Sequence, residues 1–356
     1  MNLKAMAIGT GLLLVLAVGG VLIDRQSKSP VSDEREGKLL LESIDMAKAA
    51  LIEINSGDGP ITIESKNGTW FVKEQDGFPA NGNKIRKFLL KLAGERIEHK
   101  VTENQNKLAK LHLLKLDEND NKFDKDKTGI SFSIKDESAQ PLFQLLIGGD
   151  RRTDRGIMGG YGGQYVRYPE ARAAYLIAEP LFIDTMPHDW VRNEIFRFEH
   201  KKLMKRFRIS VPGVKPYVFS RKDADSKWTL LGGGEENLDE EEVNMLARRI
   251  GDLELFKVAD PSSSAKELGR LRTGVVDFEL FDKRSYRMDI GLKKTDDEFR
   301  YIAISAKLDQ TADDETLQKE VAVFNSDFAE RIVAIYEWEA EQLLKKKEDL
   351  FAKKDK

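Results

Sequence analysis

The segment DKDKTGISFSIK, residues 124–135, contains the residue types of a calcium-binding loop. Asp124, Asp126 and Thr128 occupy its first, third and fifth positions, and a glycine stands at the sixth, where such loops turn sharply. The twelfth position requires a glutamate that supplies two oxygens. Lys135 stands there and would place a positive charge against the ion. The segment is therefore interpreted as an acidic turn that leads into a strand.

The glycine-rich segment GIMGGYGG, residues 156–163, resembles loops that bind phosphate groups. Those loops lie between a strand and a helix, so that backbone amides and the helix dipole face the anion. Here the following residues 164–168, QYVRY, alternate like a strand, which favours a hairpin loop instead. The basic residues around this loop form a candidate partner-binding site. Its residues are Arg151, Arg152, Arg155, Tyr161 and Arg167.

Two tryptophans, Trp70 and Trp228, each stand in a strand-like run that follows a turn. An aromatic residue at such a position is typical of a core or sheet-face anchor. The alternative is a ligand-facing ring beside a groove. Exposure of the two indoles to solvent distinguishes these interpretations.

No residue pattern in the chain predicts catalysis. The four histidines are scattered without the spacing of zinc ligands, and the chain has no cysteine. Neither a phosphate-binding P-loop nor a serine nucleophile elbow occurs. Carboxylates are abundant, but their spacing does not show which of them converge. We therefore predict a non-enzymatic protein without catalytic residues, metal ligands or cofactors.

The composition is that of a well-solvated globular protein. Charged residues make up 33% of the chain, and the formal net charge is -3. A dedicated nucleic-acid-binding protein shows a net basic face, so nucleic acid is not expected as a partner. The length of 356 residues is enough for two ordinary domains.

The N-terminus carries an uncharged apolar run over residues 5–23, AMAIGTGLLLVLAVGGVLI. A helix of that length can just cross the hydrocarbon core of a bilayer. We expect an uncleaved anchor in the inner membrane, with the lipid bilayer as a partner through residues 5–23 and the body in the periplasm or outside the cytoplasm. A cleaved signal peptide is the alternative, since Lys4 precedes the run and Ala17 and Gly19 offer a small-residue site.

The chain is expected to fall into five parts. These are the start and anchor over 1–30, a linker and short helix over 31–49, a first α+β module over 50–198, a second α+β module over 199–335 and a charged C-terminal helix or tail over 336–356. The short helix is predicted over Lys38 to Ala50, and the junction between the modules over Glu199 to Arg208.

The first module begins with alternating runs at 50–55 and 61–65. Asn67-Gly68 then predicts a tight hairpin turn into the strand at 69–73. A helix is predicted over Asn83 to Leu92, with Asn83 as its N-cap and Gly94 as its end. Further strands are predicted over 130–134, 142–147, 164–168 and 174–178.

The second module repeats this order. Strands are predicted over 207–211, 217–221, 227–230, 278–281, 288–292 and 301–305. A helix over Asp239 to Leu253 follows the strand of Trp228, with Asp239 as N-cap and Glu242 three residues later. This pattern predicts an α+β fold: an N-terminal transmembrane helix, then two tandem modules of twisted antiparallel sheet, each with a covering helix.

The order of these segments resembles the bacterial family catalogued as domain of unknown function 4340. The matching segments are the apolar run, the strand Ile52 to Ile54, the strand of Trp70, the helix Asn83 to Leu92, and the stretches LLIG at 145–148, GQYVR at 163–167, AYL at 174–176 and PHDWV at 187–191. The resemblance covers 39–198 well and the second module more loosely. It implies an envelope protein often encoded beside ABC-type transporter subunits, including the gliding-motility type. It implies no reaction and no site residues.

We expect a membrane-anchored accessory protein of an envelope transport or assembly complex that acts by binding proteins such as ABC-type transporter subunits. Strand edges and the loop over 151–163 are the expected contact surfaces, because edges recruit partners by β-augmentation. A glycan- or peptide-binding module and a carboxylate-dependent hydrolase remain as alternatives.

Overall fold

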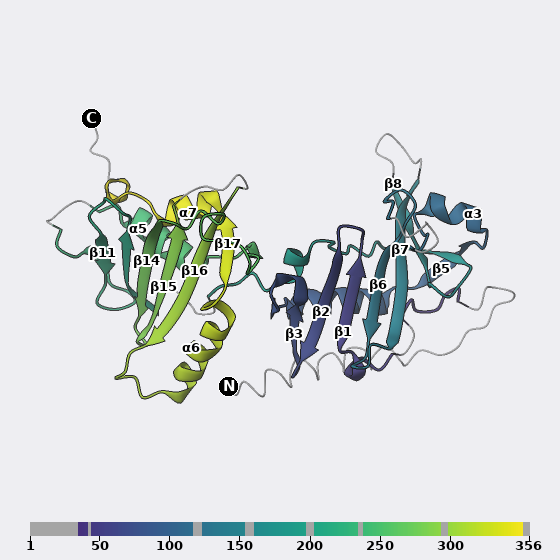
Figure 1. The fold of residues 1–356 in the computed structure, drawn as a ribbon, viewed down its shortest axis with the longest axis horizontal. Coiled ribbons are helices and arrows are strands. Elements are labelled where there is room, and N and C mark those ends of the chain that lie inside the picture. Colours follow the sequence, from purple (N-terminus) through teal and green to yellow (C-terminus); the bar gives the residue numbers. More distant parts are fainter. Residues whose placement is uncertain are drawn as a thin grey trace. The chain divides into compact units, whose positions relative to one another are not determined.

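The computed structural model describes residues 35–41, 44–116, 123–153, 160–196, 203–233, 238–292 and 298–351. The chain divides into two compact units, Met1–Arg192 and Asn193–Lys356, each with its own antiparallel sheet (Figure 1). The division falls after residue 192, six residues before the junction predicted from the sequence. In the part of the chain that the structure describes, no helix is long and apolar enough to cross a membrane. The apolar run at 5–23 lies outside those residues.

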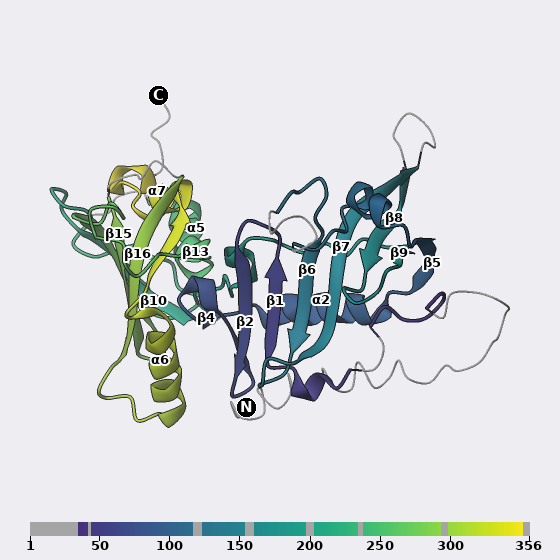
Figure 2. The same cartoon turned by 45° about the vertical axis from the view of Figure 1, so that its right-hand side comes forward.

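The sheet of the first unit has nine strands, all paired antiparallel. In spatial order they are β4 (Phe78–Pro79), β3 (Thr69–Val72), β2 (Pro60–Lys66), β1 (Leu51–Asn55), β6 (Ile130–Lys135), β7 (Pro141–Thr153), β8 (Gly160–Arg167), β9 (Ala174–Ile177) and β5 (Ile97–Thr102). Helix α2 (Gly82–Gly94) crosses one face of this sheet (Figure 2). Its Phe88 packs edge-on against Phe132 of β6 at 5.1 Å between ring centroids. Shorter elements are η2 (Met46–Lys48), η3 (Lys73–Gln75), α3 (Gln105–Leu108), η4 (Ala109–Leu111) and η6 (Pro187–Trp190).

The hairpin between β2 and β3 confirms the turn prediction. Asn67 and Gly68 have φ of 52° and 78°, the left-handed values that a two-residue hairpin turn requires. The N-cap predicted for α2, Asn83, is wrong, because the helix is capped by Asn81. The Asn81 carboxamide oxygen accepts a hydrogen bond from the backbone N–H of Lys84 at 3.0 Å.

The helix predicted over Lys38 to Ala50 is wrong, apart from the single turn η2. Leu39 instead forms an antiparallel bridge with Arg96, just after α2. Leu40 and Leu41 are buried in the core. Tertiary pairing therefore outweighs the helical spacing of the apolar residues in this segment.

The sheet of the second unit has eight strands, also antiparallel. In spatial order they are β12 (Thr229–Leu230), β11 (Tyr217–Ser220), β10 (Met204–Ser210), β14 (Thr273–Leu280), β15 (Arg284–Gly291), β16 (Phe299–Leu308), β17 (Ile332–Tyr336) and β13 (Lys257–Val258). Helix α5 (Glu240–Gly251) has Asp239 as its N-cap, as predicted. The Asp239 side chain accepts hydrogen bonds from the N–H groups of Glu241 and Glu242. The remaining helices are α6 (Glu315–Phe328), α7 (Glu337–Leu343) and η7 (Lys347–Leu350).

The C-terminal segment belongs to the core of the second unit. Ala340, Leu343 and Leu350 are at most 1% exposed. The prediction of a charged helix or tail over 336–356 identified helix α7 but missed this packing. The sequence interpretation also missed strand β17 and helix α6.

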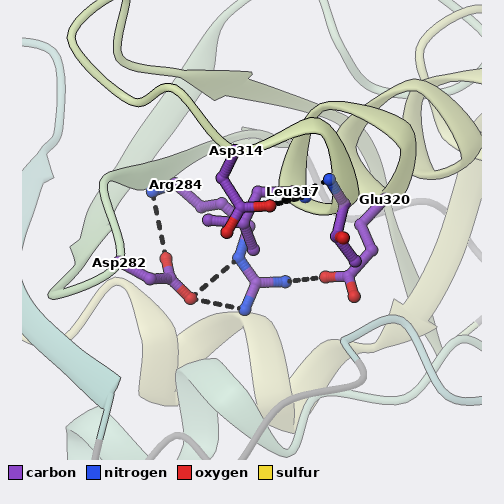
Figure 3. Close-up of polar contacts among 6 residues, drawn as sticks. Asp282, Arg284, Asp314, Leu317 and Glu320 are labelled. Carbon is purple, nitrogen blue, oxygen red and sulfur yellow. Dashed lines mark hydrogen bonds and ion pairs between the residues drawn. The ribbon is translucent and has the colours of Figure 1, made fainter. Parts of the chain in front are cut away.

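Helix α6 is fastened to the sheet by the buried Arg284 at the start of β15. The guanidinium group donates to Asp282 at 2.7 and 3.0 Å and to Glu320 of α6 at 2.9 Å (Figure 3). Burial would lower the pKa of Arg284, but the hydrogen bond to Asp282 and the charges of Asp282 and Glu320 outweigh burial and raise it. Asp314 caps the helix through the N–H groups of Thr316 and Leu317.

The two units share one topology. When the first sheet is read from β3 and the second from β12, corresponding strands occur in the same order along the chain. In both units the covering helix, α2 or α5, comes after the first three strands of its unit and before the edge strand β5 or β13. Phe207 of β10 pairs with Phe219 on one side and with Phe278 on the other. Ile52 of β1 occupies the same register position and pairs with two isoleucines. The tandem α+β modules predicted from the sequence are therefore present in the described residues, with β4 as an addition to the first and α6 to the second.

A short segment before the first strand of each unit extends the repeat. Leu39 bridges to Arg96 in the first unit, and Glu194 bridges to Glu254 in the second. Both bridges join the start of a unit to the residues that follow its helix. The repeat therefore begins near residues 38 and 193, which explains why the units divide earlier than the sequence pattern predicts.

Gly163 of β8 offers a stability test of this packing. Its φ is +110°, and a Cβ added there would lie 2.5 Å from the carbonyl oxygen of Ile177. We expect Gly163→Ala to lower the free energy of unfolding by roughly 2 kcal/mol, from backbone strain together with the clash. Gly59→Ala is the matched control, because Gly59 has φ +116° with nothing within 4 Å. Equal losses in chemical denaturation of the two variants would contradict a role for the close contact.

Candidate interaction surface

The sheet of the second unit separates apolar from charged residues onto opposite faces. Along β14 every second residue is buried, and the neighbours between them are half-buried. Phe207, Phe278 and Tyr286 lie on the buried side, which faces the helices. The opposite side carries charged and hydroxyl side chains, which we call the charged face. Its residues are Arg206, Arg208, Asp277, Glu279, Ser285, Arg287, Asp289, Ser305 and Lys307.

The charged face is hollowed into an open cavity of about 400 Å³. Arg208 lies 3.7 Å and Arg287 3.6 Å from the carboxylate of Asp277 in the middle strand β14. Arg287 also donates two hydrogen bonds to Asp289, at 2.8 and 3.0 Å. The hydrogen bond to Asp289 raises the pKa of Arg287. The cavity floor is therefore a fixed array of charges across three adjacent strands.

These ion pairs do little for stability. The Arg208 and Arg287 side chains are 46% and 51% exposed, and solvent screens pairs of this kind to about 0–1 kcal/mol. The charged face has four cationic side chains and three carboxylates, Asp277, Glu279 and Asp289. Among the described residues, the side chains of Arg206 and Lys307 have no hydrogen-bond or ion-pair partner. The charged face thus presents unneutralised positive charge to solvent.

The equivalent positions in the first unit are different. Arg206, Asp277 and Arg287 correspond in register to Leu51, Ser133 and Gln144. Part of that face is covered by the connection from β5 to β6, where Leu108 and Leu113 pack on Leu146 of β7, Ala174 and Tyr165. Two other positions are charged in both units, because Arg208 and Glu279 correspond to Glu53 and Lys135, which form an ion pair. The repeat therefore does not require charge at Arg206, Asp277 and Arg287, and the cationic excess there is a property of the second unit. The sequence signal of the charged face was the alternation of charged and aromatic residues in RFRIS, DFELF and RSYRMD.

The predicted partner-binding loop is only partly at the surface. Arg151 and Arg152 are exposed on β7, beyond Ile147, the last residue that pairs with β6. There β7 and β8 form a two-stranded ribbon that extends past the rest of the sheet (Figure 2). Tyr161 pairs with Arg152 through the backbone, and its side chain lies outside the described residues, as does Arg155.

Arg167 does not belong to an exposed site. It is 3% exposed, and its guanidinium group donates to the carbonyl oxygens of Ala171 at 2.9 Å and Leu113 at 3.2 Å. The prediction placed it at a partner surface with the other residues around the glycine-rich loop. Arg167 instead fastens two connections of the first unit to β8, and the local sequence holds no signal for that role.

The tryptophans favour the anchoring interpretation. Trp228 is 5% exposed, and its indole N–H donates to Asn244 of α5 at 3.1 Å. It also packs against Phe207, with ring centroids 5.0 Å apart. The prediction of a ligand-facing Trp228 is therefore wrong, because the ring is buried. Trp70 is half-buried on β3.

The acidic turn before β6 forms as expected. The Asp124 carboxylate pairs with Lys127 at 3.0 Å and accepts from the N–H of Asp126. The hydrogen bond to Lys127 is the main cause that lowers the pKa of Asp124. Lys135 pairs with Glu53 at 2.6 Å. Within the described residues, no group of three or more histidine, aspartate or glutamate side chains could hold a metal ion.

The described units define a class of protein: tandem α+β modules built on antiparallel sheets. The chain belongs to the family described as Domain of unknown function (DUF4340), which matches residues 70–270 and so extends from the first unit into the second. No curated protein and no solved structure matches the chain.

Proposed function

We propose that this chain is a non-enzymatic, membrane-anchored accessory protein of an envelope transport or assembly complex. It acts by binding a membrane protein partner, for which subunits of an ABC-type transporter are our leading candidate. The observation that carries this proposal is the charged face of the second unit. Its unneutralised Arg206 and Lys307 face solvent there, and the first unit has Leu51 at the position of Arg206.

The charged face suits recognition of an acidic protein surface. Arg208 and Arg287 are held by Asp277 and Asp289, so these two arginines lose little conformational freedom when a partner binds. Arginine is enriched at protein interfaces because its planar group makes several directed hydrogen bonds. Complementary charge also speeds association and excludes wrong partners.

The membrane localisation in this proposal rests on the apolar run at 5–23, which has the length of a single transmembrane span. We propose that it anchors the chain in the inner membrane with both units outside the cytoplasm. Anchoring would hold the charged face close to membrane-embedded partners and raise their effective concentration.

The test is crosslinking of the full-length protein in cells, followed by purification in mild detergent and identification of the bound proteins. We expect transporter subunits to be recovered with the unmodified protein. Arg206→Glu together with Lys307→Glu should reduce that recovery about tenfold or more, because two attractive charges become repulsive. These two side chains have no partner among the described residues, so their reversal breaks no ion pair there.

The matched control is Lys215→Glu with Lys222→Glu, which reverses two exposed charges elsewhere on the second unit. It should leave recovery unchanged. Equal recovery with the charged-face variant and the control would reject the charged face as the contact. Absence of any transporter subunit with the unmodified protein would reject the proposed partner class.

A further inference from the structure

Helix α2 of the first unit has an unusual charge pattern. Its sequence GNKIRKFLLKLAG carries four cations and no carboxylate. Ile85, Phe88, Leu89 and Leu92 face the core, whereas Lys87 and Leu90 are exposed. The outer face of the helix is therefore cationic with an apolar residue in its centre.

The equivalent helix of the second unit shows that this pattern is not needed for the fold. Helix α5 has three glutamates in its first turn and Arg248 and Arg249 in its last turn, as the helix dipole favours. In α2 the first half carries Lys84, Arg86 and Lys87, with no acidic residue in the first turn. Cations near the N-terminal end of a helix oppose the dipole. Helix stability therefore does not explain the charges of α2.

The segment 182–190, which contacts Lys91, Lys84 and Phe88 of α2, also carries exposed apolar side chains. Phe182, just after β9, is 80% exposed, the largest exposed fraction of any large hydrophobic side chain among the described residues. The Lys91 ammonium group lies 5.4 Å from the centre of its ring. Met186 is 43% exposed and Leu90 is 36% exposed. We call Arg86, Lys87, Leu90, Lys91, Phe182 and Met186 the α2 patch.

Phe182 is held in position and does not lie on a loose chain. Its neighbour Leu181 is 1% exposed, and the Leu181 N–H donates to the Gln164 side chain at 2.8 Å. Further along, Trp190 is buried against Phe88 of α2. Lys84 of α2 pairs with Asp184 and also donates to the carbonyl oxygen of Asp189 at 2.6 Å. The exposed ring is thus presented by an ordered segment.

We propose that the α2 patch lies against an anionic membrane surface. Phe182, Leu90 and Met186 would enter the interface between headgroups and acyl chains, while Arg86, Lys87 and Lys91 contact lipid phosphates. Aromatic and aliphatic side chains combined with lysine and arginine are the composition of interfacial membrane-binding faces. Residues 179–190 carry the carboxylates Glu179, Asp184 and Asp189, of which Asp184 is paired with Lys84 and Asp189 lies 3.8 Å from His188.

The tether makes this contact geometrically accessible. This step rests on the proposed membrane anchor at 5–23. Residues 24–34 separate that run from the described start of the first unit at Arg35. Eleven residues reach at most about 40 Å when fully extended. The first unit would therefore stay near the bilayer, where a cationic apolar patch on its surface meets lipid.

The experiment uses the absence of native cysteine. Phe182→Cys is introduced into the full-length protein, labelled with an environment-sensitive fluorophore and reconstituted into vesicles containing phosphatidylglycerol. We expect a blue-shifted emission, protection from aqueous iodide and quenching by nitroxide-labelled lipid. The matched control is Gln144→Cys, an exposed position on the sheet face opposite α2. Its label should remain accessible to iodide.

A second pair of measurements tests the charge contribution. Lys87→Glu with Lys91→Glu should lower the ratio of docked to undocked labelled protein by roughly fivefold or more per cation. Vesicles of phosphatidylcholine alone, which carry no net charge, should lower this ratio in the same way for the labelled protein that keeps both lysines. A label at position 182 that is as accessible as the one at 144 would overturn the proposal. Protection in native membranes but not in pure lipid would overturn it too, because the occupant would then be a protein. If the protein does not float with vesicles at all, the membrane anchor fails and this inference fails with it.

Discussion

Replacing Trp190 with alanine is expected to lower the free energy of unfolding of the first unit by about 4 kcal/mol. Trp190 is 2% exposed and is among the largest fully buried side chains. Its ring packs edge-on against Phe88 of α2, with centroids 6.1 Å apart, and Lys84 lies over its face. Truncation would remove these contacts and leave a cavity between α2 and the segment that follows β9.

A milder substitution of Trp190 serves as the control for Trp190→Ala. The indole N–H of Trp190 donates to the carbonyl oxygen of Asp184 at 3.0 Å. Trp190→Phe keeps much of the ring volume but loses this bond, and we expect a loss of about 1–2 kcal/mol. Calorimetry of the full chain would measure both. Similar small losses for the two variants would show that the segment does not depend on the ring.

The second large effect is expected at Arg284. Arg284→Met should lower the free energy of unfolding of the second unit by about 3 kcal/mol, because it leaves Asp282 and Glu320 without their buried cation. The loss is limited by solvent, since the Glu320 side chain is 43% exposed. Methionine has a similar length and keeps the apolar packing, so the loss reports mainly on charge.

Hydrogen exchange gives this prediction a local readout. Glu320 lies on α6, so amides of α6 should exchange faster in Arg284→Met, while those of α5 change little. Arg272→Met is the control, since Arg272 is exposed and its side chain has no partner among the described residues. Arg272→Met should change the free energy of unfolding by less than about 0.5 kcal/mol, as is usual for surface positions. Unchanged exchange in α6 would contradict the role of Arg284 as its fastening.

Local sequence patterns predicted the elements that local physics determines. Asn67-Gly68 encodes its own turn, and Asp239 caps α5 with the residue spacing that a helix start requires. The alternation of apolar residues located most long strands. Helix α6 has comparable signals, with Asp314 as cap and Leu317, Val321, Phe324 and Phe328 on one stripe, although no element was predicted between the strand at 301–305 and the tail at 336–356.

The surfaces depended on information that a single segment does not contain. The charged face exists because β10, β14 and β15 are neighbours, although Arg208 and Asp277 are far apart in the chain. Arg167 is buried because residues near Leu113 fold over β8. The cations of α2 can be recognised in the sequence. The exposed Phe182 beside Lys91 of that helix, however, comes from a segment almost a hundred residues later. Such juxtapositions follow only from the topology.

The shared topology has a consequence for how the chain is made. In each unit the edge strand, β5 or β13, leaves the ribosome long before β9 or β17, the strand that it pairs with in the sheet. Neither sheet can be completed until the last strand of its repeat has emerged, so a partly made unit exposes unpaired backbone. Such late, long-range pairing slows folding and exposes intermediates to aggregation. Biogenesis of this protein should therefore depend on holding each repeat unfolded until its C-terminal strand is available, and truncation just before β9 or β17 should yield insoluble chains.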